Sequence, residues 1–263
     1  MRELPVTGDP ARVVVAGDWD GNQRWAARVI NYAADHRAGF VVQCGDFGYR
    51  GNRGWTDVYL SHLDSVLARR GIELYWIDGN HENHPLLAQI PIDPETGRRP
   101  ITDYISHLPR CYRWCWHGQT WLALGGAHSV DRRWGQQGRD WWPEEELSAQ
   151  DAARAIQGGP ADVIVAHDCP AGVAIPGLDR PSSWPAEDLA ASEEHRHRIQ
   201  SVVDATHPHT LFHGHFHRRY NGEYLSPDGN RTHIIGLAED AAASLNANCV
   251  LIDLPIPAER EEN

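Results

Sequence analysis

The chain has 263 residues, of which 41% are hydrophobic and 23% charged, as is ordinary for a globular protein with a full core. Its 36 acidic residues outnumber the 24 basic ones, and a formal net charge of −12 disfavours non-specific binding to a nucleic-acid backbone. No run of about 18 apolar residues and no apolar N-terminal signal stretch is present, so we expect a cytoplasmic protein without a membrane partner.

Three residue types are used in unusual ways. Every basic residue is arginine, which favours a GC-rich bacterial or phage genome, although guanidinium groups also suit phosphate binding. The five cysteines are scattered and odd in number, so they predict neither a zinc site nor a disulfide framework. The 16 histidines cluster, with five between His207 and His217.

The first half of the chain alternates short apolar runs with helical patterns. Apolar runs at residues 12–16, 40–44 and 72–77 predict buried strands, each followed by a Gly-Asp or Asp-Gly pair. Apolar residues at helical spacing predict helices over about 23–36 and over 57–70. Repeated strand–helix units predict parallel strand pairing with right-handed crossovers.

The second half is less regular. We expect an exposed loop at residues 90–100, a hairpin over 112–124, helices over 144–156 and about 186–205, and strands at 163–166, 210–212, 234–235 and 250–252. No internal repeat or low-complexity domain is present. The simplest prediction is one α/β domain over residues 1–256 with a polar tail at 257–263.

Four predicted strands are each followed by side chains that can bind a metal. These are Asp18, Asp46, Asn80 with His81, and His167. Open α/β sheets place ligand sites at the carboxyl ends of their strands. One Gly-Asp pair after a strand is usually only a turn, but carboxylates and imidazoles after four strands suit divalent first-row metals. The loop 214–217 adds two more histidines, enough for two ions that share one carboxylate.

These motifs resemble the calcineurin-like metallophosphoesterase superfamily, in its bacterial and phage-type members. The family signature is Asp-x-His, Gly-Asp, Gly-Asn-His-Glu, an isolated His and Gly-His-x-His. This chain reads Asp18-Trp19-Asp20, Gly45-Asp46, Gly79-Asn80-His81-Glu82, His167 and Gly214-His215-Phe216-His217, in the family's order. The resemblance implies a four-layer αββα sandwich with two mixed β-sheets and a dinuclear metal site at the strand C-termini.

The resemblance also implies a role for each matched residue. One carboxylate would bridge two divalent ions, expected to be manganese or iron, with magnesium, zinc, nickel or cobalt as alternatives. The bridging ligand would be Asp46, the first-ion ligands Asp18 and His217, and the second-ion ligands Asn80, His167 and His215. A hydroxide held by the ions would attack phosphorus in line.

Two further side chains are expected to act on the substrate. His81 would stabilise the transition state or protonate the leaving oxygen. Arg50 matches a phosphate-binding arginine of the phosphoprotein phosphatase branch, and a plain surface arginine is the alternative.

Two residues depart from the family pattern. Asp20 stands where the family has a histidine, and a further carboxylate would favour manganese, iron or magnesium over zinc. Tyr49 gives a Gly-Asp-x-x-Tyr pattern similar to that of purple acid phosphatases, in which the phenolate binds ferric iron. The alternative, which we favour, is that Tyr49 forms an aromatic wall of the cleft.

The segment from residue 125 to 145 is similar to one in bacterial and mycobacteriophage members of the superfamily. It supplies His128, Asp131 and Arg132 as candidates for the rim of the site, with a locally hydrogen-bonded loop as the alternative. The chain has 11 tryptophans, which suit base stacking or, for most of them, core packing.

The function expected is hydrolysis of a phosphomonoester on a small-molecule or protein substrate. A phosphodiesterase or nuclease is the alternative, although the acidic composition does not favour nucleic acid. A catalytically silent metal-binding scaffold is a rival of another class. The presence of His81 and of a complete second-ion set argues against that rival.

Overall fold

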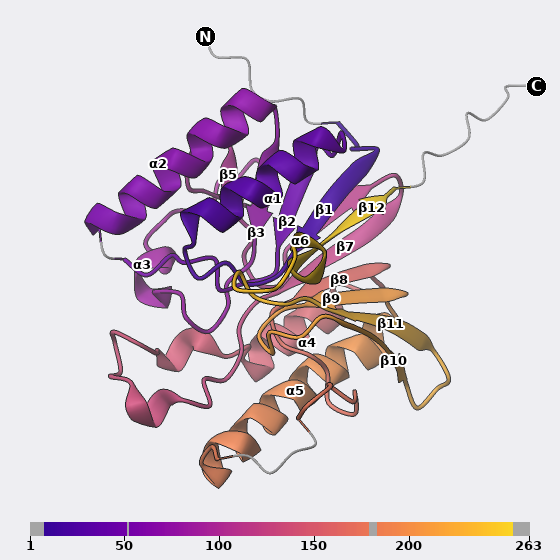
Figure 1. Ribbon diagram of the computed structural model, residues 1–263. Coiled ribbons are helices and arrows are strands. Elements are labelled where there is room, and N and C mark those ends of the chain that lie inside the picture. The colour runs from indigo at the N-terminus through magenta and orange to yellow at the C-terminus, as the bar shows by residue number, and fades with distance from the viewer. Residues whose placement is uncertain (1–7, 52, 179–182, 255–263) are drawn as a thin grey trace, which may run out of the picture.

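Two six-stranded sheets lie at the centre of the molecule (Figure 1). The computed structural model describes residues 8–51, 53–178 and 183–254, so the tail expected at 257–263 lies outside the described residues. The first sheet has the order β12 (Cys249–Asp253), β1 (Arg12–Ala16), β2 (Phe40–Gln43), β3 (Glu73–Trp76), β5 (Ile105–His107) and β4 (Arg99–Pro100). The second has the order β10 (Tyr220–Leu225), β11 (Arg231–Gly236), β9 (Thr210–His213), β8 (Val163–Ala166), β7 (Gln119–Leu124) and β6 (Arg113–Trp116).

Both sheets are mixed. The β1–β2, β2–β3, β7–β8 and β8–β9 pairs are parallel, as the strand–helix pattern predicts. Antiparallel β12 and β10 lie at one edge of each sheet. The carboxyl ends of the parallel strands therefore share one side of each sheet.

Helices cover the outer face of each sheet and complete four layers (Figure 1). The first sheet packs against α1 (Gln23–Asp35) and α2 (Arg53–Arg70), and the second against α4 (Ala149–Gln157) and α5 (Ala186–Thr206). Short helical segments in the loops are α3 (His84–Ala88), η1 (Arg132–Trp134), η2 (Pro143–Glu145) and α6 (Leu245–Asn248). The expected αββα sandwich is confirmed. Among the described residues, none of these helices is both long and apolar enough to span a membrane.

The alternation of side chains along β1 shows how the layers are held together. Val13 and Val15 point into the core between the two sheets, whereas Val14 and Ala16 point into the core beneath α1 and α2. All four are fully buried. A buried valine side chain contributes about 1.5–3 kcal/mol, so a strand with both faces buried must be apolar throughout.

The helix predicted over 144–156 is divided in two. Glu145 is fully buried, and its carboxylate accepts hydrogen bonds from the backbone N–H and the hydroxyl of Ser129. Glu146 is then extended, with ψ 146°, and α4 begins only after Ser148, whose hydroxyl caps it. The burial of one charged side chain against a neighbouring loop thus interrupts a segment with helical periodicity.

Candidate metal centre

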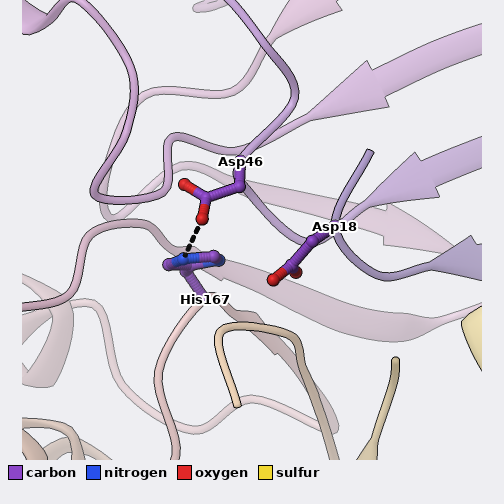
Figure 2. Close-up of side chains that lie close together, drawn as sticks. All are labelled: Asp18, Asp46 and His167. Carbon is purple, nitrogen blue, oxygen red and sulfur yellow. Dashed lines mark ion pairs between the residues drawn. The ribbon is translucent and has the colours of Figure 1, made fainter. Parts of the chain in front are cut away.

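The loops that follow five strands bring the expected ligands together from both sheets. Asp18, Asp46 and Asn80 follow β1, β2 and β3, whereas His167 and the 215–217 loop follow β8 and β9. Figure 2 shows Asp18, Asp46 and His167 pointing into one space. One possible ligand atom from each of these three lies within 4.8 Å of the others.

The inner half of the centre, which we define as Asp46, Asn80, His167 and His215, is deeply placed. His167 Nε2 lies 3.4 Å from Asp46 Oδ2 and 3.0 Å from Asn80 Oδ1, while its Nδ1 lies 2.7 Å from the Cys44 carbonyl oxygen. A donor bond from Nδ1 to that carbonyl leaves Nε2 available to a metal. The His215 ring lies 5.1 Å from that of His167.

The outer half, which we define as Asp18, Asp20, His217 and Glu239, is richer in carboxylates. His217 Nε2 lies 3.1 Å from Asp18 Oδ2, and its Nδ1 lies 3.1 Å from Glu239 Oε2. Possible ligand atoms of Asp20, His217 and Glu239 lie within 4.8 Å of one another. Asp20 also accepts a hydrogen bond from Arg50 at 2.6 Å.

Glu239 is absent from the sequence-based expectations. It lies in the loop after β11, outside every recognised motif, and no local pattern distinguishes it from a surface acid. Its position against the second nitrogen of His217 follows only from the order of strands in the second sheet. A carboxylate in this position fixes the tautomer and orientation of a metal-binding imidazole.

Four residues of the centre have left-handed backbone conformations, which are uncommon outside glycine. Their φ values are 46° for Asp20, 51° for Asp46, 65° for His215 and 55° for His217. Such a conformation costs on the order of 1 kcal/mol or more and persists where the surroundings enforce it. Strain at four clustered polar residues is an observation, independent of the motifs, that marks a functional site.

Glycine is required at two motif positions, because the backbone there lies against a carboxylate that is expected to bind metal. A Cβ at Gly214 would lie less than 3.0 Å from Asp18 Oδ1, and one at Gly79 less than 3.0 Å from Asp46 Oδ1. Any other residue would displace the carboxylates. The glycines before Asn80 and His215 are therefore part of the site's geometry.

Buried glutamates hold the ligand-bearing loops in place through hydrogen bonds. Glu82, fully buried, accepts hydrogen bonds from the backbone N–H groups of Asp46, Gly48 and Gly79. Burial and the charge of Asp46 raise its pKa to about 7. Asn80 Nδ2 donates to Ser129 Oγ at 2.9 Å, and that hydroxyl donates to Glu145. These bonds fix the amide so that its oxygen faces His167.

The clustered carboxylates of the centre repel one another, so positive charge placed among them is stabilising. Burial, together with Asp46 and Asp18, raises the pKa of Asp20 to about 7. The ring of His167 is buried, yet Asp46 and Asp18 raise its pKa to about 10. Oxygen and imidazole donors at these separations form a set that divalent first-row metals take, so the residues present fit a metal centre.

A cavity of about 470 Å³ adjoins the centre and contains both residues expected to act on the substrate. His81 and Arg50 line it, as do Asp131 and Arg132 from the segment after β7. The backbone N–H of His81 donates to Asp46 Oδ1 at 3.0 Å, which ties the cavity to the metal centre.

Two other candidates lie away from the cavity. His128 is 1% exposed, and its ring nitrogens lie 2.8 Å from Glu146 and 3.3 Å from Asp188, so it is placed inside the wall behind the rim. Tyr49 packs in the core beneath α1 and α2, with its ring 6.0 Å from Trp76. Burial and Asp57 of α2 raise its pKa, which keeps the phenol protonated. Tyr49 thus packs in this core and is not among the residues that line the cavity.

Comparison with known proteins places this arrangement in a family. The family model described as calcineurin-like phosphoesterase matches residues 11–219. Among solved structures, TT1561 of Thermus thermophilus is similar with a TM-score of 0.53 and 11% identity, over 93% of this chain and 99% of that one. A dimetal phosphatase from Danio rerio has a TM-score of 0.53 and 13% identity, over 94% and 93%. A sequence search of curated proteins found no match.

Glu239 falls outside the matched residues, whereas every residue of the inner half falls within them. The family match covers most of the chain, and the two solved structures share its fold. The chain therefore belongs to the calcineurin-like phosphoesterase family and is a metal-dependent phosphoester hydrolase.

Proposed function

We propose that this enzyme is a dinuclear phosphomonoesterase. The observation that carries the proposal is the cavity, in which His81 meets the guanidinium groups of Arg50 and Arg139. In a protein of net charge −12, the guanidinium groups of Arg50 and Arg139 beside a metal centre suit a terminal phosphoryl dianion, although Asp131 and Asp140 line the same cavity. A monoester carries one more negative charge than a diester and gains more from these groups.

The centre has donors for two divalent ions. Asp46 would bridge them, the inner ion would take Asn80, His167 and His215, and the outer ion would take Asp18 and His217, with Asp20 at its edge. When bound, such ions neutralise charge on the phosphoryl oxygens and acidify water near neutral pH. The carboxylate-rich outer half favours manganese or iron over zinc.

The chain's own residues position the substrate. Arg50, whose side chain is held at 2.6 Å from Asp20, is placed to bind a phosphoryl oxygen through its remaining donors. His81, anchored through its backbone to Asp46, is placed to hold a proton for the leaving oxygen.

The five cysteines are unpaired, which supports the proposal of a reducing, cytoplasmic location. The lysine-free composition supports a bacterial or phage origin. A phosphorylated small molecule suits a cavity of about 470 Å³ better than nucleic acid or a protein surface.

The test compares p-nitrophenyl phosphate with bis(p-nitrophenyl) phosphate as substrates of the Mn²⁺-loaded enzyme. We expect the monoester to be hydrolysed with the higher kcat/KM, and His81→Ala to lower that value by about 100-fold or more. His197→Ala, on the exposed face of α5, is the matched control. Preference for the bis ester would establish a phosphodiesterase, and no turnover of either ester would overturn the enzymatic proposal.

A further inference from the structure

The cavity beside His81 has two walls of different origin. The loops after β2 and β3 supply Arg50 and His81, whereas the segment 131–141 supplies Trp134, Arg139 and Trp141. This segment lies between β7 and α4 and projects beside α3 (Figure 1). A volume of about 470 Å³ falls in the range of small-molecule sites, about 300–1,000 Å³. The wall with Arg50 and His81 adjoins the metal centre, and the wall formed by segment 131–141 can recognise the leaving group.

Trp141 is held as a rigid platform. The Arg132 guanidinium lies 4.8 Å from the centroid of its ring, and Arg132 in turn lies 3.0 Å from Glu145 and 3.3 Å from Glu146. Because two carboxylates compensate its charge, Arg132 supports the indole rather than capturing phosphate. Trp141 Nε1 is buried and has no hydrogen-bond partner within the part of the chain that the structure describes. Because this N–H is closed off from solvent, the indole offers the cavity its ring and not its donor.

Trp134 supplies a second indole to the same cavity. It is 58% exposed, although its ring packs edge to face with Trp184 at 5.1 Å. The Arg133 guanidinium covers one face of the ring, 4.0 Å from its centroid, and more than half of the side chain is still exposed to solvent. Two indoles on one cavity wall are suited to stacking against a flat aromatic ring.

Polar groups stand among these indoles. Asp131 and Asp140 offer acceptors, while Arg139 offers donors. Arg139 is 71% exposed and pairs only at the surface with Asp140, at 3.0 Å, so exchanging this pair for a ligand costs little. A nucleobase edge carries both donors and acceptors, whereas a plain phenyl ring would leave these groups unpaired.

We propose that the substrate is a nucleoside monophosphate, with its phosphate at His81 and Arg50 and its base against Trp134 and Trp141. This inference rests on the proposed phosphomonoesterase function. Water adds to phosphorus as the bond to the nucleoside oxygen breaks, and that oxygen takes a proton. The products are a nucleoside and inorganic phosphate.

The test measures phosphate release by the Mn²⁺-loaded enzyme from AMP and from glycerol 2-phosphate, which has no ring. We expect AMP to have the higher kcat/KM and Trp134→Ala to reduce the preference for AMP about tenfold, as loss of one stacking partner does. Trp141→Phe keeps an aromatic ring of smaller area, and we expect a smaller reduction. Leu225→Ala, 60% exposed on β10, is the control that leaves the preference unchanged.

Binding is read separately from quenching of tryptophan fluorescence by AMP. Equal kcat/KM for the two esters, or an unchanged preference in both tryptophan variants, overturns the nucleotide inference and leaves the phosphomonoesterase intact. Quenching by AMP that Trp134→Ala weakens, without hydrolysis of any ester, overturns the proposed function while the nucleotide site stands. Neither quenching nor hydrolysis overturns both.

Discussion

The two halves of the metal centre differ in how firmly they are held. In the inner half, Asp46, Asn80 and His167 are at most 2% exposed. Asp46 accepts a hydrogen bond from the His81 backbone N–H, Asn80 donates one to Ser129, and His167 Nδ1 donates one to the Cys44 carbonyl oxygen. In the outer half, the side chains of Asp20, His217 and Glu239 are 28%, 39% and 37% exposed. Asp18 of the outer half is also fully buried, and His215 of the inner half is partly exposed, so solvent reaches most of the outer half but, in the inner half, only His215.

This difference in exposure indicates which ligand positions can accept another residue. A buried ligand that leaves its position exposes unpaired polar groups to a low-dielectric interior, so its identity is constrained. A ligand at the surface can be exchanged, because water completes the coordination. Asp20 replaces the family histidine in the outer half, and Glu239 is added there. We expect the inner ion to bind tightly and the outer ion to exchange readily.

The largest effect is expected from removing an inner ligand. Asn80→Ala deletes the amide oxygen facing His167 and the donor to Ser129 Oγ. We expect activity to fall by at least about 100-fold, more than for the loss of a residue that only supports a ligand. Metal analysis after desalting should show one ion fewer per chain. Asn221→Ala, on the exposed strand β10, serves as control. Two retained ions with near-normal turnover would remove the distinction between the halves.

An intermediate effect is expected from Glu239→Gln. The amide still occupies the space beside His217 Nδ1 but no longer offers a carboxylate to that nitrogen, so the affinity for the outer ion should fall about tenfold. Calorimetric titration with Mn²⁺ should show the inner-ion affinity unchanged. Glu187→Gln, at the exposed start of α5, is the matched control. Equal weakening of both ions would show that Glu239 acts on the whole centre.

A smaller effect is expected from restoring the family residue with Asp20→His. Replacing a carboxylate by an imidazole makes the outer half less anionic and softer, which should shift its preference from manganese towards zinc by about fivefold. Competition between the two metals, followed by metal analysis, measures the ratio. The variant also loses the Arg50 ion pair, so Arg50→Ala must be measured alongside it. An unchanged ratio would mean that Asp20 does not reach the outer ion.

The smallest effect on activity is expected from replacing Asp168, the residue that follows His167. Its effect on stability should nevertheless be measurable. Burial opposes ionisation of Asp168, yet His195 at 2.6 Å lowers its pKa to about 2. Because the folded pKa lies below the unfolded value of about 4, this carboxylate stabilises the fold above pH 4 and the contribution is lost as pH falls towards 2.

Asp168→Asn should therefore lower the free energy of unfolding more at pH 7 than at pH 3. Urea denaturation at both pH values measures this difference. Asp253→Asn, in an exposed pair with Arg12, should change stability little at either pH. A pH-independent loss in Asp168→Asn would mean that packing, not ionisation, holds the inner half.

The sequence predicted the strands and helices around the site because their signals are local. β1 is apolar on both faces, which is the pattern of a strand buried between two layers. A polar residue directly after such a strand must lie at the sheet's carboxyl edge. The predicted helix over 144–156 was wrong at its start, since the burial of Glu145 depends on Ser129, a residue in another loop.

What the sequence determined by itself was an α/β domain with parallel strands and the candidate inner ligands, since strand period and glycine position are set within a few residues; the αββα architecture was implied by the resemblance of its motifs to the family. What only the tertiary structure decided was which distant groups meet. Glu239 reaches His217 through the order of strands in the second sheet, Tyr49 turns into the core beneath α2, and Trp134 and Trp141 join Arg50 at one cavity. The physical reason is that a local pattern sets the direction of a side chain, whereas the partner it meets depends on how whole layers pack.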